Sequence, residues 1–329
     1  MKISHSIAFA GLVLALPGAA LAQDPATRSG PGWPTKPIRL IVPFTTSAAS
    51  DVLSRIVGQR LSEIYGQQVV IDNRPGAGGL IGSDLTRHAA PDGYTLAMVG
   101  QPHLSNVLLR EDKPYDPLKD FTAISLVAST PNIIVVGKSV TAKNIPELIA
   151  LAKAKPGSLN YGSAGVGSSS HLAGALFVSK AGINVVHVPF RVGADSRTAL
   201  ITGTIHFYVY PLPAIMGMVK TGTIRPLAVA TPRRAEALPD VPTSAEAGFG
   251  AYQSESWFGF IGPRGLPKRI IDRVYGDTAK VLTEPATREK IVMQGAEPRS
   301  STPGEFEKMQ RKEYAELGAL IKQIGMKTQ

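Results

Sequence analysis

The chain has 329 residues, no cysteine and a formal net charge of +10 at pH 7. The missing cysteine excludes disulfides, zinc–thiolate sites, thiol nucleophiles and a lipid anchor attached through cysteine. Lysine and arginine are scattered rather than clustered, so the positive charge indicates solubility and attraction of small anions, and no nucleic-acid partner is expected.

The first residues predict an export signal. Lys2 gives a basic start, Ile7–Leu16 is an apolar run, and an Ala-Leu-Ala pattern of small residues ends at Ala22. This order is typical of a secretory signal peptide, so we expect residues 1–22 to be cleaved near Ala22. The mature protein is then expected to be soluble and periplasmic. A Pro- and Gly-rich leader at 23–34 is expected to be disordered.

Strands and helices alternate along the mature chain. The sequence predicts strands at 38–42, 69–71, 94–99, 121–136 (on either side of Thr130 and Pro131), 159–161, 185–188, 205–210, 227–230 and 254–261. It predicts helices at 51–65, 81–89, 146–154, 169–180, 194–201, 214–221, 268–282, 286–294 and 303–324. This alternation is typical of α/β folds, in which helices cover both faces of a parallel sheet.

The alternation occurs twice, in two units of similar rhythm. We interpret the segments at 121–136 and 254–261 as strands that cross between the units, which returns the last helices to the first unit. The expected first domain is therefore 35–129 with 254–329, and the expected second domain is 130–253. Two α/β domains joined by two crossing strands form a clamp with a ligand cleft at the carboxyl ends of the strands.

One stretch, 160–180, has the composition of an anion site. A short strand leads into three glycines and a serine trio at 168–170, and an apolar helix follows. Glycine allows the backbone to approach a ligand closely, and a helix start offers unpaired amides at the positive end of its dipole. A carboxylate or phosphate suits such a place. The alternative is an ordinary turn in which Ser168 caps the helix.

Other chemical motifs are weak. The glycines at 76–82 do not fit a dinucleotide fingerprint, the histidines lack metal-ligand spacing, and no signature assembles a Ser–His–Asp triad. We therefore expect no cofactor, no metal and no enzymatic activity. His206 is interpreted as structural. His171 is either a packed or capping residue or a ligand contact, and Arg191 is either a surface residue or a contact for an anion in the cleft.

Several stretches carry a resemblance to a known family. They are residues 33–44 with Asp51, 70–79, 90–96, 162–172 with 188–190, and 238–248. In this order and spacing they resemble the Bug family, the extracytoplasmic solute receptors of tripartite tricarboxylate transporters, over essentially the whole mature chain. The resemblance implies a type II periplasmic binding-protein fold that closes on a small organic carboxylate.

The resemblance also implies where the ligand is held. Family receptors bind a carboxylate largely through backbone groups and ordered waters, in the loop after the first strand and in the Gly/Ser loop of the second domain. A carboxylate that accepts several N–H bonds needs no arginine partner. The candidate ligand-binding residues are Phe44, Thr45, Thr46, Ser47, Ala48, Ala49, Asp51, Gln101, Ser163, Ala164, Gly165, Gly167, Ser168, His171 and Arg191.

The chain departs from the family pattern in two places. Residues 45–49 stand where the family has Pro-x-Gly-Gly, so a tighter or hydroxyl-lined pocket is expected there. Ala199 and His206 stand where the family has two acidic residues, which removes negative charge near the cleft. Ligand identity is therefore less transferable than the fold.

Three functions are compatible with these features. The first is a monomeric periplasmic receptor that binds an aliphatic or aromatic mono-, di- or tricarboxylate and delivers it to the membrane permease subunits of a tripartite transporter. The second is a ligand-sensing partner of a membrane sensor kinase, because the same closed clamp would serve it. The third is an exported α/β enzyme, against which the lack of an activated nucleophile or metal set argues.

Overall fold

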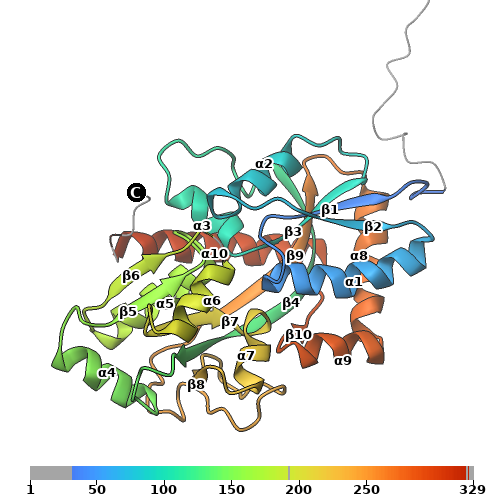
Figure 1. Cartoon of the computed structure of the whole chain (residues 1–329). Coiled ribbons are helices and arrows are strands. Elements are labelled where there is room, and N and C mark those ends of the chain that lie inside the picture. The colour runs from blue at the N-terminus through green and yellow to red at the C-terminus, as the bar shows by residue number, and fades with distance from the viewer. Residues whose placement is uncertain (1–31, 192, 324, 326–329) are drawn as a thin grey trace, which may run out of the picture.

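A computed structural model describes residues 32–191, 193–323 and 325 of the chain. The predicted signal peptide at 1–22 and most of the predicted leader at 23–34 lie outside these residues. In the described part, strands and helices form two groups, which Figure 1 shows at the upper right and the lower left. The two-domain α/β fold predicted from the alternation is confirmed.

The first group is built from both ends of the chain. Its elements are β1 (Ile38–Val42), α1 (Ala49–Tyr65), β2 (Val69–Asn73), the 3₁₀ turn η2 (Ala77–Gly79), α2 (Leu80–Arg87), β3 (Thr95–Gly100), α3 (Pro102–Leu108), α8 (Lys268–Thr283), α9 (Pro285–Met293), β10 (Glu297–Pro298) and α10 (Pro303–Gln323). Strand β1 pairs in parallel with both β2 and β3. The C-terminal helices pack on this group, α8 against α1 and α10 against α3.

The second group comes from the middle of the chain. Its elements are α4 (Ile145–Ala154), β5 (Asn160–Ser163), α5 (Ser169–Ala181), β6 (Val186–Pro189), α6 (Gly193–Thr202), β7 (Phe207–Pro211), the 3₁₀ turn η3 (Leu212–Ala214), α7 (Met216–Lys220) and β8 (Arg225–Val229). Strand β5 pairs in parallel with β6 and β7. The carboxyl ends of β1 and β5 therefore each lead into a loop that starts a helix.

Two strands connect the groups, β4 (Phe121–Val136) and β9 (Glu255–Pro263). The first part of β4 pairs antiparallel with β9, which in turn pairs with β3. From Asn132 onward β4 pairs with β7 and β8 instead. One sheet path, β2-β1-β3-β9-β4-β7-β5-β6, thus runs through the molecule. The sequence predicted two strands around Pro131, and the structure has one continuous strand whose partner changes there.

The buried side chain of Asn132 lies at this change of partner. Its Nδ2 donates to Ser254 Oγ at 2.7 Å, and its Oδ1 accepts from Ser256 Oγ at 3.1 Å. A buried amide is tolerated because both of its polar atoms are paired. The arrangement supports our proposal that the domains divide at residues 129–130 and 253–254.

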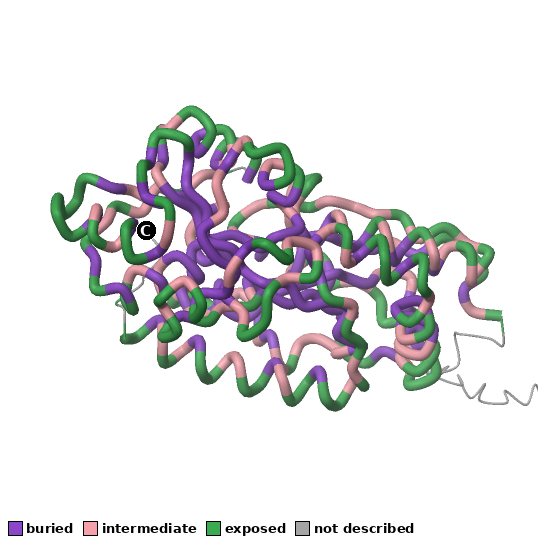
Figure 2. Tube along the Cα trace, turned by 90° about the horizontal axis from the view of Figure 1, so that it is seen from below, coloured by how far each residue is buried: buried purple, intermediate pink, exposed green. Residues whose placement is uncertain are grey.

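Helices cover both faces of each sheet. In β1, Leu40 packs in the cluster that includes α1 and α8, whereas its neighbour Ile41 packs with α3 and α10. In β4, Ile133 and Ile134 likewise enter different clusters of the second group. Alternate strand residues point to opposite faces, so both faces are apolar in a doubly covered sheet. Figure 2 shows the buried segments concentrated in the interior of the molecule, with exposed segments around the outside.

Helix α3 is absent from the elements predicted by the sequence. Its residues from Pro102 to Val107 are all buried. A helix with no solvent-facing side has no amphipathic period, which removes the pattern that marks a helix in a sequence.

The approach of α10 to β9 depends on Gly259. A Cβ at this position would overlap the Phe306 ring and lie 2.8 Å from the Ser125 carbonyl oxygen. Gly259→Ala should therefore lower the free energy of unfolding by about 1–3 kcal/mol, because the ring or the neighbouring strand must move. Urea unfolding followed by circular dichroism measures the change.

Gly276→Ala in α8 is the matched control for this substitution. A Cβ there meets nothing within 4 Å, and alanine is favoured over glycine inside a helix by about 1 kcal/mol. This variant should be at least as stable as the natural chain. Equal stability of the two variants would contradict the packing of α10 on the crossing strand.

Candidate functional site

Two adjoining cavities lie between the domains, beyond the carboxyl ends of β1 and β5. The inner cavity, of about 40 Å³, is lined by Phe44, Ala48, Ala49, Ser50, Ala164, Ser168, Ser169, Ser170, Tyr210, Pro211 and Phe258. The outer cavity, of about 620 Å³, shares Phe44, Ala48, Ala164 and Tyr210 with the inner one. Both domains thus contribute walls to each cavity.

The outer cavity is wider and less uniform. Its first-domain wall includes the turn at residues 75–80, Asn106 and Arg110, and its second-domain wall includes Phe190 and Arg191. The Arg110 guanidinium binds Asp112 with two hydrogen bonds, at 2.7 and 2.6 Å. Arg191 is exposed at the opposite wall. Arg110 is thus paired with an acidic side chain, and Arg191 contributes a positive charge at the opposite wall.

The inner cavity lies at the starts of two helices from different domains. Helix α1 begins at Ala49, and its N-cap Ala48 makes no side-chain hydrogen bond. Helix α5 begins at Ser169, and its N-cap Ser168 accepts a hydrogen bond from the His171 amide. The first amides of a helix have no acceptor within the helix and lie at the positive end of its dipole. The inner cavity therefore favours an anion.

Ser50 adds a second feature to this site. Its hydroxyl is buried and has no hydrogen-bond partner among the residues that the structure describes, and Ser50 lines the inner cavity. A buried hydroxyl without a partner costs about 1–3 kcal/mol. A ligand oxygen placed in the cavity would satisfy both this hydroxyl and the uncapped start of α1.

The loop after β1 is held from behind by Asp51. Its carboxylate accepts hydrogen bonds from the Ser47 amide at 3.0 Å and from Asn73 Nδ2 at 3.0 Å, and it pairs with Arg55 at 2.9 Å. Burial raises the pKa of Asp51, but the hydrogen bonds from Arg55, Ser47 and Asn73 outweigh burial and hold this pKa below its usual value. We interpret Asp51 as a residue that positions the loop.

Residues of the first loop line both cavities. The methyl groups of Ala48 and Ala49 line the inner cavity, and Thr45 lines the outer one. Ser47 has a φ of 64°, a left-handed conformation that costs a residue with a Cβ about 1–2 kcal/mol. The hydrogen bond from its backbone amide to the Asp51 carboxylate keeps Ser47 in this conformation.

The loop of the second domain uses most of its own amides internally. Three amides bind side chains of the same domain: Ala164 to Ser170 Oγ (3.0 Å), Gly165 to Ser163 Oγ (3.2 Å) and Gly167 to His171 Nδ1 (3.1 Å). The groups left to meet a ligand are the first amides of α5 and the hydroxyls of its serine trio. The groups of this loop that remain available to a ligand therefore lie nearer the start of α5 than the predicted residues 163–168.

The two domains touch through this second loop. Ser105 Oγ of α3 donates to the Gly167 carbonyl oxygen at 3.0 Å. Gly167 also admits the Asn106 side chain to a space that a Cβ would occupy. Asn106 Nδ2 in turn donates to the Gly78 carbonyl oxygen at 2.5 Å. Helix α3 therefore links the second loop to the turn at 75–80 on the opposite wall.

The predicted site residues fall into three groups. Those that line a cavity are Phe44, Thr45, Ala48, Ala49, Ala164, Gly165, Ser168 and Arg191. Those that support the loops from within are Ser47, Asp51, Ser163, Gly167 and His171. Gln101 lies apart, with its Nε2 donating to Glu313 Oε1 at 2.8 Å, and Thr46 is exposed.

Several cavity residues were not predicted from the sequence. They are Ser50, Ser169, Ser170, Tyr210, Pro211 and Phe258 around the inner cavity, and the turn at 75–80, Asn106 and Arg110 around the outer one. Tyr210 lies at the carboxyl end of β7, and the turn at 75–80 follows the carboxyl end of β2; ligands bind at these ends in parallel sheets. That rule, applied to every strand, would have indicated them. Burial raises the pKa of Tyr210, so its hydroxyl stays protonated.

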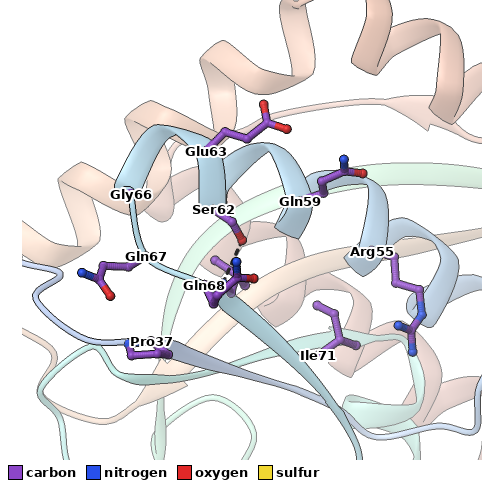
Figure 3. A pocket seen from close by; sticks show the side chains of 10 residues that line it. Pro37, Arg55, Gln59, Ser62, Glu63, Gly66, Gln67, Gln68 and Ile71 are labelled. Carbon is purple, nitrogen blue, oxygen red and sulfur yellow. Dashed lines mark hydrogen bonds between the residues drawn. The ribbon is translucent and has the colours of Figure 1, made fainter.

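A larger hollow, of about 740 Å³, lies elsewhere on the first domain. Figure 3 shows that it is formed by α1 and β2, with Gln59 and Glu63 on one side and Gln68 on the other. It involves one domain only and includes Pro37 and Gln68, at the amino ends of the strands. We therefore place the functional site between the domains, at the carboxyl ends.

The described residues contain no cluster of three or more His, Asp or Glu side chains arranged to hold a metal ion. Among the helices that the structure describes, none combines the length and the apolar character needed to cross a membrane.

A two-domain α/β clamp with an anion-favouring cavity between its domains defines a solute-binding protein. The chain belongs to the tripartite tricarboxylate transporter receptor family (TctC), whose family model matches residues 53–326. This family consists of periplasmic binding proteins, and its fold is that of solute-binding receptors. The Bug-family resemblance predicted from the sequence is thereby confirmed.

Relatives and solved structures agree with this assignment. BugT of Bordetella pertussis is 30% identical over 329 residues, covering 99% of each chain, and a Cupriavidus necator protein from the gbd 5′ region is 32% identical over 326 residues, covering 99% of each chain. An R. palustris protein solved with adipate is 35% identical, with a TM-score of 0.86, covering 90% of this chain and 99% of its own. MatC of Rhodopseudomonas palustris, solved with malate, is 26% identical, with a TM-score of 0.82 and coverage of 88% and 100%.

Buried histidines make the stability of the fold depend on pH. Burial lowers the pKa of His103 and His171 to about 3, whereas an unfolded histidine titrates near its ordinary value of about 6.5. The unfolded state thus binds more protons between pH 7 and 5. Lowering the pH from 7 to 5 should reduce the free energy of unfolding, by up to about 2 kcal/mol for each ring. Urea unfolding at both pH values measures the loss.

His103→Asn isolates one ring, because His103 lines neither cavity. The free energy of unfolding should fall less between pH 7 and 5 in this variant than in the natural chain, by the contribution of one histidine, up to about 2 kcal/mol. Burial raises the pKa of Glu313, which acts in the opposite direction, and comparing the two proteins cancels its contribution. If the variant and the natural chain lose the same stability between pH 7 and 5, the His103 ring of the folded protein must already be protonated at pH 5.

Proposed function

We propose that this chain is a periplasmic receptor that closes its two domains around a small organic carboxylate and delivers it to the membrane components of a tripartite transporter. The inner cavity binds one carboxylate group. The outer cavity holds the rest of the molecule and sets the specificity.

One observation carries this proposal: the starts of α1 and α5 meet at a buried cavity that also contains the unpaired Ser50 hydroxyl. The Ala48 N-cap leaves the α1 start without a side-chain acceptor, and a buried helix start without partners requires a ligand or water. A cavity of about 40 Å³ has room for one carboxylate group or for a small number of waters. A carboxylate supplies acceptors to both helix starts at once.

The outer cavity favours a ligand with more than one polar end. Its walls include the apolar ring of Phe190, with Arg110 and Arg191 on opposite sides. An aliphatic or aromatic chain packs on the apolar part, and a second carboxylate lies within the field of Arg191. The ligands of the similar R. palustris proteins, adipate and malate, are both dicarboxylates and support this class.

Closure of the cleft couples binding to delivery. The bond from Ser105 Oγ to the Gly167 carbonyl oxygen joins the domains directly, so a ligand that contacts both loops stabilises this closed arrangement. The N-terminal pattern that predicts export, with cleavage near Ala22, supports a periplasmic location, where the transporter subunits would receive the closed form.

A panel of carboxylates tests this function by thermal unfolding. Adipate, malate and an aromatic monocarboxylate should be compared, and at least one should raise the Tm by several degrees, because a ligand at a hundred times its Kd adds about 2.7 kcal/mol of stability. Adipamide, the neutral analogue of adipate, is the matched control. No shift with any carboxylate, or an equal shift with adipamide, would contradict carboxylate recognition.

Ser50 and Ser54 provide a matched pair of variants. Both hydroxyls are buried in α1 without a partner among the described residues, but only Ser50 lines the cavity. Ser50→Ala should weaken binding of the carboxylate by about 1 kcal/mol, or about fivefold in Kd, the contribution of one hydrogen bond. Ser54→Ala should leave the Kd unchanged. Calorimetry that finds equal effects for both variants would exclude Ser50 as a ligand contact.

A further inference from the structure

Two histidines stand behind the loop of residues 163–168, called the second loop below. His171 belongs to the first turn of α5 and His187 to β6, and their rings stack with centroids 3.9 Å apart and an angle of 7° between planes. The His187 ring also stacks on Tyr161 at 4.8 Å, and Tyr161 stacks on Phe207 at 5.6 Å. The pair thus ends a column of rings that begins in the core of the second domain.

Each imidazole is bonded to one end of the second loop. The Gly167 amide donates to His171 Nδ1 at 3.1 Å. At the other end, His187 Nε2 lies 2.7 Å from Ser163 Oγ, which also accepts a hydrogen bond from the Gly165 amide at 3.2 Å. The column of rings therefore supports the loop at both ends.

The second loop needs such support because its glycines are conformationally free. Gly165 has a φ of 108° and Gly167 a φ of 77°, values that glycine adopts readily but does not prefer over others. Ordering such a segment costs conformational entropy. The loop reaches the ligand site, since Gly165 lines the outer cavity and Ser168 the inner one.

The hydrogen bond from the Gly167 amide requires a neutral His171 ring, and the close stacking disfavours a charge on both rings. His171 Nδ1 accepts a hydrogen bond, so it carries no proton, and the proton of the neutral ring is on Nε2. Two protonated rings at 3.9 Å would repel each other. Burial lowers the pKa of both rings, and for His171 the neighbouring His187 lowers it further. The titratable group stacked on the pair is the Tyr161 phenol, whose pKa burial raises.

We infer that His171 and His187 are positioning residues of the ligand site: a stacked pair of neutral imidazoles that sets the second loop for a carboxylate without lining the cavities. The inference rests on the proposed function, because it makes carboxylate affinity depend on the geometry of this loop. Neither ring lines the inner or the outer cavity, so the pair acts through Gly167 and Ser163.

Substitutions at His171 separate its hydrogen bond from its bulk. His171→Leu keeps a similar volume and removes the acceptor for the Gly167 amide, so it should weaken adipate binding by about fivefold to tenfold, as measured by calorimetry at pH 7. The side-chain oxygen of Asn can take the place of Nδ1, and His171→Asn should therefore recover most of the lost affinity. Binding by the Leu variant as tight as that of the natural chain would overturn the inference, as would a lack of recovery in the Asn variant.

His206→Leu is the matched control in the same domain. His206 Nδ1 lies 3.2 Å from the Asn160 amide nitrogen and 2.9 Å from Asn160 Oδ1, so this ring is also hydrogen-bonded, at the opposite end of β5. His206 lines neither cavity. This variant should lose stability without changing the Kd for adipate. An equal loss of affinity in the His171→Leu and His206→Leu variants would reduce the role of His171 to general stability and overturn the inference.

A spectroscopic measurement without ligand tests the support directly. In ¹⁵N-labelled protein, a coupling across the N–H···N bond should connect the Gly167 amide to His171 Nδ1, persist in His206→Leu and vanish in His171→Leu. A missing coupling in the natural chain would overturn this inference alone. A coupling that is present while no carboxylate of the panel binds would overturn the proposed function and, with it, the assignment of the loop to carboxylate binding.

Discussion

The paired side chain of Asn132 joins the two crossing strands at the point where β4 leaves one domain and enters the other. Its side chain binds Ser254 and Ser256, and its carbonyl oxygen accepts from the Ala230 amide at 2.7 Å. A displacement of either strand would leave a buried polar group unpaired, at a cost of about 1–3 kcal/mol. This junction lies where we propose that the two domains divide.

Most of the fold follows from patterns in the sequence. The buried strand β1 and the amphipathic helix α1 were predicted because a continuous apolar run and a helical period are strong local signals. Their boundaries differ by a few residues, since helix ends depend on caps and on tertiary contacts. Helix α3 was not predicted, because its buried positions include the polar residues His103, Ser105 and Asn106, so polarity does not follow a helical period. The change of partner at Pro131 depends on pairing between distant strands, which no local pattern records.

The candidate site was predicted in part, because loop composition can indicate a ligand whereas the direction of a side chain in a strand cannot be read from the sequence. Phe44 and Ser168 lie in loops whose composition indicates a ligand, and both line the cavity. Tyr210 and Phe258 also line it, but an aromatic residue in a strand looks the same in a sequence whether it faces the core or a ligand. Asp51 and His171 differ from these aromatic residues. Both were named as candidate ligand-binding residues, but their hydrogen-bond partners belong to the protein itself.

The return of the C-terminal helices to the first domain has a consequence for the order in which the chain can fold. The second domain, as proposed at 130–253, is one continuous stretch, so all of its core residues, Tyr252 included, are available once that stretch has been synthesised. The first domain lacks α10, which packs on α3 and β4, until the end of the chain exists. The domain that begins first is therefore completed last.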